Sequence, residues 1–241
     1  MQKALNVAII SVILVAIIFT ALMLILKYDE KGETNMPFKV SKISIISTAD
    51  AQDVEDKNNK WNKIVELDND IYIYIDKNEQ YKKTETIERV VINNFKIIEQ
   101  PKKGKISIYK PVEDKNAIFK NNDESKVEEV IYIGEQSTEI QKLQISNQGG
   151  IIAFRFANLD IGNLISNENQ LEYKDLLKII NVTDEEIKSK VSFDMTIELN
   201  GGKKFKSEAI ELIIPVENIV QNGKSSKEIE DLDLVFKRIE N

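Results

Sequence analysis

An acidic stretch after residue 49 has the residue types of a cation site. Asp50, Asp53, Glu55 and Asp56 place four carboxylates within seven residues. Ca²⁺ prefers several carboxylate and carbonyl oxygens on one loop, so this stretch is a candidate metal site. The spacing departs from an EF-hand loop, and no Gly stands at the required turn position. The competing interpretation is a solvated acidic loop at residues 50–60 whose charges repel one another.

Two other groups of side chains could bind an organic ligand. Tyr72 and Tyr74 lie two residues apart, so they share one face of a strand and could form an aromatic platform for a glycan. Arg155 is one of three Arg in the chain and could clamp a carboxylate with two hydrogen bonds. Ordinary packing competes in both cases. Phe154 and Phe156 point to the face opposite Arg155, which favours an arginine on the solvent side of a sheet.

The composition excludes several kinds of chemistry. The 241 residues contain no Cys and no His. This excludes disulfides, Cys-based zinc sites, thiol nucleophiles and mechanisms that need an imidazole. The net charge of −7 argues against nucleic acid as a partner, because phosphate neutralisation needs clustered Lys and Arg. We expect no cofactor and no enzyme activity. A hydrolase that uses two carboxylates stays open as an alternative, since the 40 Asp and Glu residues provide many pairs.

The strongest pattern in the chain is at its N-terminus. Residues 4–26 contain no charged side chain. A helix of that length measures about 35 Å at roughly 1.5 Å per residue, and the hydrocarbon core of a bilayer is about 30 Å thick. A cleaved signal peptide has a shorter apolar stretch and a small-residue cleavage site, which the following Lys27-Tyr28-Asp29 does not provide. We expect an uncleaved transmembrane helix over 4–26.

The orientation of this helix is predicted from the lengths of the two segments that flank it, because the flanking charges do not decide it. Lys3 lies on one side of it and Lys27 and Lys31 on the other, so flanking charge is balanced. A very short tail precedes the helix and most of the chain follows it. The sequence therefore predicts a single-pass protein of the cytoplasmic membrane with its body outside. The expected parts are a cytoplasmic tail at 1–3, the transmembrane helix at 4–26, a polar stalk at 27–37 and an extracytoplasmic domain at 38–241.

Strand patterns dominate after the stalk. Val191 to Leu199 alternate apolar and polar residues with the period of a half-buried strand, and Asn200-Gly201-Gly202 turns the chain back into Phe205 to Ile214. A turn is expected at Asp68 to Asp70, and a hairpin is expected at Gly149-Gly150, between Ile145 and the strand that begins at Ile151. Short strands at this spacing are typical of an antiparallel β-sandwich. The other expected strands are 38–46, 61–67, 71–75, 87–98, 106–109, 127–133, 143–145, 151–156 and 232–239.

One segment breaks the strand pattern. Apolar residues at helical spacing predict a helix over 172–180, and Thr183 with Glu186 forms the pattern of a capping box for a second short helix. The sequence thus predicts a short helical insertion at about 171–190. We expect one sandwich domain, and the alternative is two smaller sandwiches that divide near 115–125.

A resemblance to other proteins rests on five segments of the chain, at 46–50, 78–97, 103–111, 145–150 and 235–241. These segments resemble a group of uncharacterised single-pass membrane proteins of low-GC, clostridia-like bacteria. The resemblance covers most of the chain, including the N-terminal apolar segment. It implies membrane placement and no particular activity.

These patterns favour a non-catalytic role. The leading hypothesis is an interaction or assembly module of the cell envelope that binds another envelope protein or itself. The alternative is an envelope sensor or ligand-binding module for a glycan or a divalent cation, and the second alternative is the carboxylate-based hydrolase. β-Sandwiches present edges and loops suited to recognition, but a fold does not by itself define a function.

Overall fold

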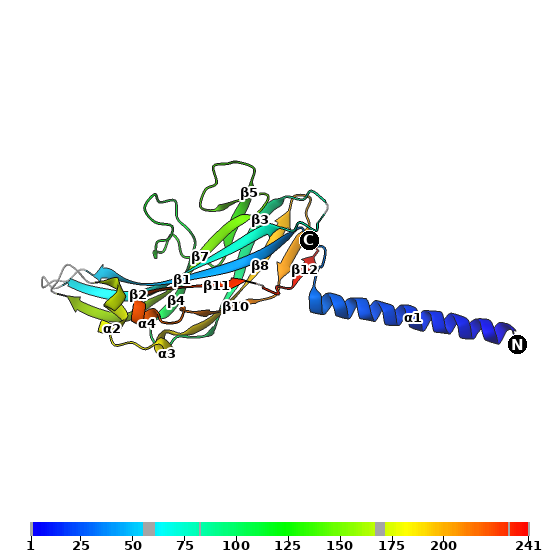
Figure 1. The fold of residues 1–241 in the computed structure, drawn as a ribbon, viewed down its shortest axis with the longest axis horizontal. Coiled ribbons are helices and arrows are strands. Elements are labelled where there is room, and N and C mark those ends of the chain that lie inside the picture. The colour runs from blue at the N-terminus through cyan, green and yellow to red at the C-terminus, as the bar shows by residue number, and fades with distance from the viewer. Residues whose placement is uncertain (1, 55–60, 82, 167–171, 231, 241) are drawn as a thin grey trace.

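The computed structural model describes residues 2–54, 61–81, 83–166, 172–230 and 232–240. Its strands form two sheets that pack face to face, with short helices at one end and one long N-terminal helix at the other (Figure 1). The expected fold class is therefore confirmed: a mainly β sandwich, a short helical insertion and an N-terminal apolar helix of membrane-spanning length.

The N-terminal helix α1 (Gln2–Lys31) extends beyond the predicted end at residue 26. Within it, Ile9–Lys31 is long and apolar enough to cross a membrane, and the body of the protein covers none of its most apolar part. Large apolar side chains such as Ile10 and Leu24 are each 63% exposed. The helix thus projects away from the sandwich, and its apolar surface is not covered by the body (Figure 1).

The first sheet, called sheet A here, contains three strands of 17 residues each. Its order is β11-β1-β2-β7-β4, and every neighbouring pair is antiparallel. The strands are β1 (Phe38–Val54), β2 (Trp61–Lys77), β4 (Lys105–Tyr109), β7 (Gly150–Ser166) and β11 (Lys224–Glu230).

Two sequence expectations for sheet A are wrong. Residues 50–54 belong to β1 and not to a loop, and the turn expected at Asp68 to Asp70 lies in the middle of the single strand β2. The reason is Asn69, which takes the place of an apolar residue on the inner face. Its side chain accepts a hydrogen bond from Ser47 Oγ at 2.7 Å and donates one to the carbonyl of Phe156 at 3.1 Å.

The second sheet, called sheet B, has the order β12-β9-β8-β3-β5-β6, with β10 also paired to β8. All pairs are antiparallel except β5 and β6. The strands are β3 (Ile87–Glu99), β5 (Val130–Glu135), β6 (Gln144–Ser146), β8 (Ser189–Leu199), β9 (Lys204–Ser207), β10 (Ile210–Ile214) and β12 (Phe236–Ile239).

The hairpin between β8 and β9 is confirmed, with Ile197 opposite Phe205. The strand expected over Phe205 to Ile214 is divided into β9 and β10, which both pair with β8. The hairpin expected at Gly149-Gly150 is wrong, because that turn joins β6 of sheet B to β7 of sheet A. Each sheet contains strands from before and after residues 115–125.

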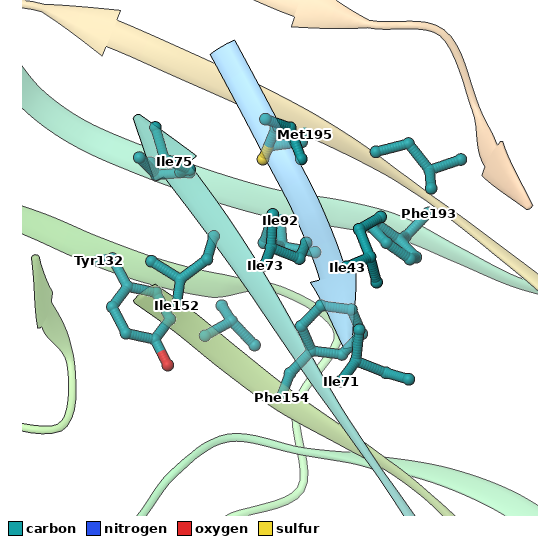
Figure 2. Close-up of a cluster of buried hydrophobic side chains, with 14 of the residues drawn as sticks. Ile43, Ile71, Ile73, Ile75, Ile92, Tyr132, Ile152, Phe154, Phe193 and Met195 are labelled. Atoms are coloured by element: carbon teal, nitrogen blue, oxygen red, sulfur yellow. The ribbon is translucent and has the colours of Figure 1, made fainter. Parts of the chain in front are cut away.

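The main core lies between the inner faces of the two sheets. Ile71, Ile73 and Ile75 of β2 are fully buried at successive inner positions. Figure 2 shows them beside Ile43 and Phe154 from sheet A, opposite side chains from sheet B. The rings of Phe154 and Phe193 meet edge to face across the core, with centroids 4.9 Å apart.

A smaller second core lies where sheet A extends past sheet B. The helical elements are a 3₁₀ turn η1 (Tyr173–Asp175), α2 (Leu176–Ile179), α3 (Asp184–Ile187) and α4 (Ile219–Asn222). Leu176, Leu177 and Ile219 pack there against Val65 and Leu67 of β2. The short helices therefore cover the inner face of the extended strands, at the end opposite α1 (Figure 1). The capping box is confirmed by the Thr183 N–H, which donates to Glu186 Oε2 at 2.9 Å.

Candidate functional site

The outer face of sheet A carries a largely covered cation, Arg155 of β7. Register places it opposite Asp70 of β2, and the two side chains form a bidentate pair, with Nε to Oδ1 at 2.6 Å and Nη2 to Oδ2 at 3.1 Å. Nη1 lies 2.7 Å from Asp68 Oδ2. The Arg155 side chain is only 14% exposed. It lies on the face opposite Phe154 and Phe156, as expected, but other side chains leave little of it in contact with solvent.

The segment between β4 and β5, residues 110–129, supplies the cover. Asn121 donates from Nδ2 to Glu66 Oε1 at 3.0 Å and to Asp68 Oδ1 at 2.8 Å. Its Oδ1 accepts a hydrogen bond from Arg155 Nη1 at 3.2 Å. The buried ring of Phe119 lies 4.8 Å from the guanidinium carbon, within reach of a cation–π interaction. The Asn121 side chain thus links the carboxylates of Glu66 and Asp68 to Arg155 through hydrogen bonds.

Burial has the largest effect on the pKa values of the carboxylates in this cluster. Burial raises the pKa of Asp68 from 3.8 to about 7, although Arg155 and Asn121 act in the opposite direction. Burial also raises the pKa of Glu66. For Arg155 burial lowers the pKa, but the hydrogen bond to Asp70 and the charges of Asp68 and Asp70 outweigh it, so the net pKa is raised. The arginine stays charged, and Asp68 is the group that changes charge near neutral pH.

Of the two expected metal ligands that lie within the described residues, Asp50 and Asp53, only Asp50 lies in this cluster. Oxygens of Asp50, Glu66 and Asp68 lie within 4.8 Å of one another. Three carboxylates at this distance suit a hard cation. However, oxygens of Glu66 and Asp68 already accept hydrogen bonds from Asn121. Asp53 pairs instead with Lys63, whereas Glu55 and Asp56 lie outside the described residues.

The two tyrosines do share the outer face of sheet A, and both are half-buried. Lys42 Nζ lies 4.5 Å from the centroid of the Tyr74 ring and 2.8 Å from Glu228 Oε1. A cation therefore already occupies one face of Tyr74. Burial raises the pKa of Tyr72. A stacked sugar would have to displace Lys42, so the arrangement gives the glycan platform little support.

Two open recesses lie elsewhere on the surface. One of about 350 Å³ lies beside Ile213, Pro215 and Glu217. The other, of about 450 Å³, lies beside Pro111 and Lys120. Glu66 and Asp68, the carboxylates with raised pKa, line neither of them. Other carboxylates do line the recesses, among them Glu217 in the first and Asp114 in the second. The hydrogen bond from Lys120 lowers the pKa of Asp114, which does not suit the general acid of a hydrolase.

The junction between α1 and the body forms a second structured feature. The Tyr28 hydroxyl accepts a hydrogen bond from the Arg238 N–H at 2.8 Å, and the Glu33 N–H donates to the carbonyl of Phe236 at 2.6 Å. Arg238 and Glu33 also form an ion pair at 3.0 Å. Met36 then enters the main core. Strand β12 therefore holds the C-terminal end of α1, and residues of the expected stalk pack against the body.

Comparisons with protein-family models, with curated proteins and with solved structures found no match to this chain. The candidate sites therefore rest on geometry and chemistry alone. Sequence reasoning missed Glu66, Asp68, Asp70 and Asn121. One signal could have found the first three. Leu67 stands in the same period-two series as Ile71 to Ile75, with Asn69 as its one polar member, and this series places 66, 68 and 70 together on the other face.

Replacing Gly32 with Ala is expected to loosen the junction. Gly32 has φ of +65°, and an added Cβ would lie 2.4 Å from the carbonyl oxygen of Phe236. The strained conformation and the clash together are expected to cost about 1–3 kcal/mol. Limited proteolysis of the full chain in detergent measures this as faster cleavage after α1. Gly201→Ala is the control, because Gly201 also has positive φ but an added Cβ there meets nothing within 4 Å. Equal cleavage of both variants would contradict the junction.

Proposed function

We propose that this protein is a single-pass membrane protein whose sandwich lies outside the cytoplasm as a non-catalytic interaction or assembly module of the cell envelope. The observation that carries the proposal is the junction. An apolar helix of membrane-spanning length is joined to β12 through Tyr28 and Glu33, so helix and body move together. A body held in this way presents its far end at a constant height above a membrane.

The body itself supports a binding role more than a catalytic one. Its interior is filled by two apolar clusters, and the buried carboxylates face Arg155 and Asn121. The hydrolase alternative gains no supporting observation. The sensor alternative has weaker support than the assembly role, since Lys42 covers Tyr74 and the oxygens of Glu66 and Asp68 are engaged.

A single cysteine tests the membrane placement. The chain has no Cys of its own, and Ile213 of β10 is 57% exposed, so Ile213→Cys gives one reactive thiol on the body. We expect the full chain to stay in the membrane after an alkaline wash. We also expect a membrane-impermeant maleimide to label the thiol in intact cells. Labelling only after lysis would place the body in the cytoplasm and contradict the proposal.

The interaction role is tested in the same cells by crosslinking the tagged full chain. A version without residues 38–241 keeps the helix and serves as the control. A stoichiometric crosslinked species that needs the body is the expected result. A pattern identical to that of the control would overturn the assembly role.

A further inference from the structure

We propose that the far end of sheet A is a self-contact surface through which two anchored copies of this chain associate. This inference rests on the proposed function, because it needs both copies in one membrane. The surface lies on the outer face of the sheet, where β1 ends, β2 begins and β7 ends. We call it the distal patch, and it consists of Gln52, Val54, Asn62, Ile64, Asn163 and Ile165.

Strand register places these six side chains on one face. Val54 lies opposite Asn62, which lies opposite Ile165, and the next row runs Gln52, Ile64, Asn163. Side chains alternate between the faces of a strand. Val65, which follows Ile64, and Leu164, which lies between Asn163 and Ile165, point the other way, into the second core beneath the short helices. Val54 and Ile165 remain 39% and 65% exposed.

The six side chains of the distal patch carry no charge, in a chain with 30% charged residues. Apolar and amide side chains are interspersed in its two rows. The next row of the same face holds Asp50 and the buried Glu66, whose Oε1 accepts a hydrogen bond from Gln52 Nε2 at 2.9 Å. The outer face of sheet B is different, since Arg89 pairs there with Glu198 and Lys206 with Asp194. Protein interfaces are depleted of charge at their centres. The rest of the outer face of sheet A also carries ion pairs, such as Arg155 with Asp70. The lack of charge is therefore confined to the distal patch and marks it as a contact surface.

Charge favours a second copy as the occupant. A two-fold contact brings each residue close to the same residue of the other copy. A charged side chain near the axis would therefore lie close to the same charge on the other copy and be repelled by it. The net charge of −7 adds repulsion between the two bodies. An uncharged surface is the one that such a chain can place against itself.

The position of the anchor favours the same occupant. The distal patch and α1 lie at opposite ends of the molecule, and the long strands of sheet A run between these ends (Figure 1). A two-fold axis along that direction lets two patches face each other while both helices enter one membrane from the same side. Antiparallel pairing of two β11 edges would need an axis normal to the sheet, which would point the helices in opposite directions.

The size of the patch predicts a weak contact. Six side chains cover much less than the roughly 800 Å² per partner of a stable interface. Confinement in a membrane raises the effective concentration of the two bodies. We therefore expect pairing in the membrane and its loss in dilute detergent.

Cysteine crosslinking in native membranes tests the proposal on the full chain. Ile165→Cys places a thiol in the distal patch, and Ile213→Cys is the matched control, an isoleucine of similar exposure on β10. A short bismaleimide is expected to give a dimer of Ile165→Cys in which two differently tagged copies are recovered together. The control is expected to give only a background dimer. Equal dimer from both variants, or a crosslink of Ile165→Cys to a different protein, would overturn the self-contact.

A charge series gives a second readout that does not depend on the fold. With Val54→Cys as reporter, Asn163→Lys alone and Asn163→Asp alone are each expected to lose the dimer. Co-expression of the two is expected to restore a mixed dimer, and failure to restore it contradicts the two-fold contact. The anchor is read separately from membrane retention and labelling of Ile213→Cys. Correct retention without a dimer defeats only the self-contact, whereas loss from the membrane defeats the proposed function and the self-contact together.

Discussion

Replacing Arg155 with Met is expected to destabilise the sandwich by about 3–5 kcal/mol, the usual effect of removing one partner from a buried ion pair. Arg155 is the cation that faces both Asp68 and Asp70, and its side chain is 14% exposed. Methionine keeps most of the apolar stem but leaves these carboxylates without their counter-charge. Asn121 and Phe119 also lose a contact each, so the covering segment 110–129 is expected to open before the sheets separate.

Urea unfolding of the full chain in detergent, followed by circular dichroism, measures the loss. Arg89→Met is the matched control, since Arg89 is 41% exposed in its pair with Glu198 and such pairs contribute about 0–1 kcal/mol. Combining Arg155→Met with Asp70→Asn is expected to recover part of the stability, because one unpaired charge disappears. A cost for Arg155→Met no larger than that of the control would show that the cluster is not stabilised by its arginine.

The parts of the fold that sequence reasoning predicted are those with a strong local pattern. The hairpin of β8 and β9 follows from the strict alternation of apolar and polar residues and from a Gly-Gly turn. The start of α3, the last helix of the insertion, follows from the capping box at Thr183. The N-terminal apolar helix can be predicted from its amino-acid composition alone. In each case the interactions that decide the structure lie within about ten residues of one another.

The errors have the opposite origin. Asn69 indicates a turn when read locally, yet Ser47 and Phe156 satisfy its side chain within the sheet. Strand β11 has few apolar residues and exists because β1 pairs with it. Asn121 comes 34 residues before its partner Arg155, so no spacing rule could join them. The candidate site therefore depends on tertiary contacts that the sequence does not display.

Replacing Asp68 with Asn is expected to remove much of the loss of stability that the native protein shows between pH 5 and pH 8. The folded-state pKa of Asp68 is about 7, well above its ordinary value of 3.8. A group whose pKa is raised by folding contributes stability that is fully present below its unfolded pKa and is lost as the pH rises through the folded pKa. Between pH 5 and pH 8 this loss amounts to about 2–3 kcal/mol at most for one group.

The comparison of variants separates this effect from the other carboxylates. Asp194 and Glu85 have lowered pKa values and stabilise the fold in the opposite pH direction, but they do so equally in native and variant chains. Asp76→Asn is the matched control, because Asp76 lies on the same strand and the same face but is exposed. Unfolding free energies measured at pH 5, 6, 7 and 8 should diverge between the native chain and Asp68→Asn alone. Parallel curves would mean that Asp68 is ionised throughout this range, and that Arg155 and Asn121 compensate its burial in full.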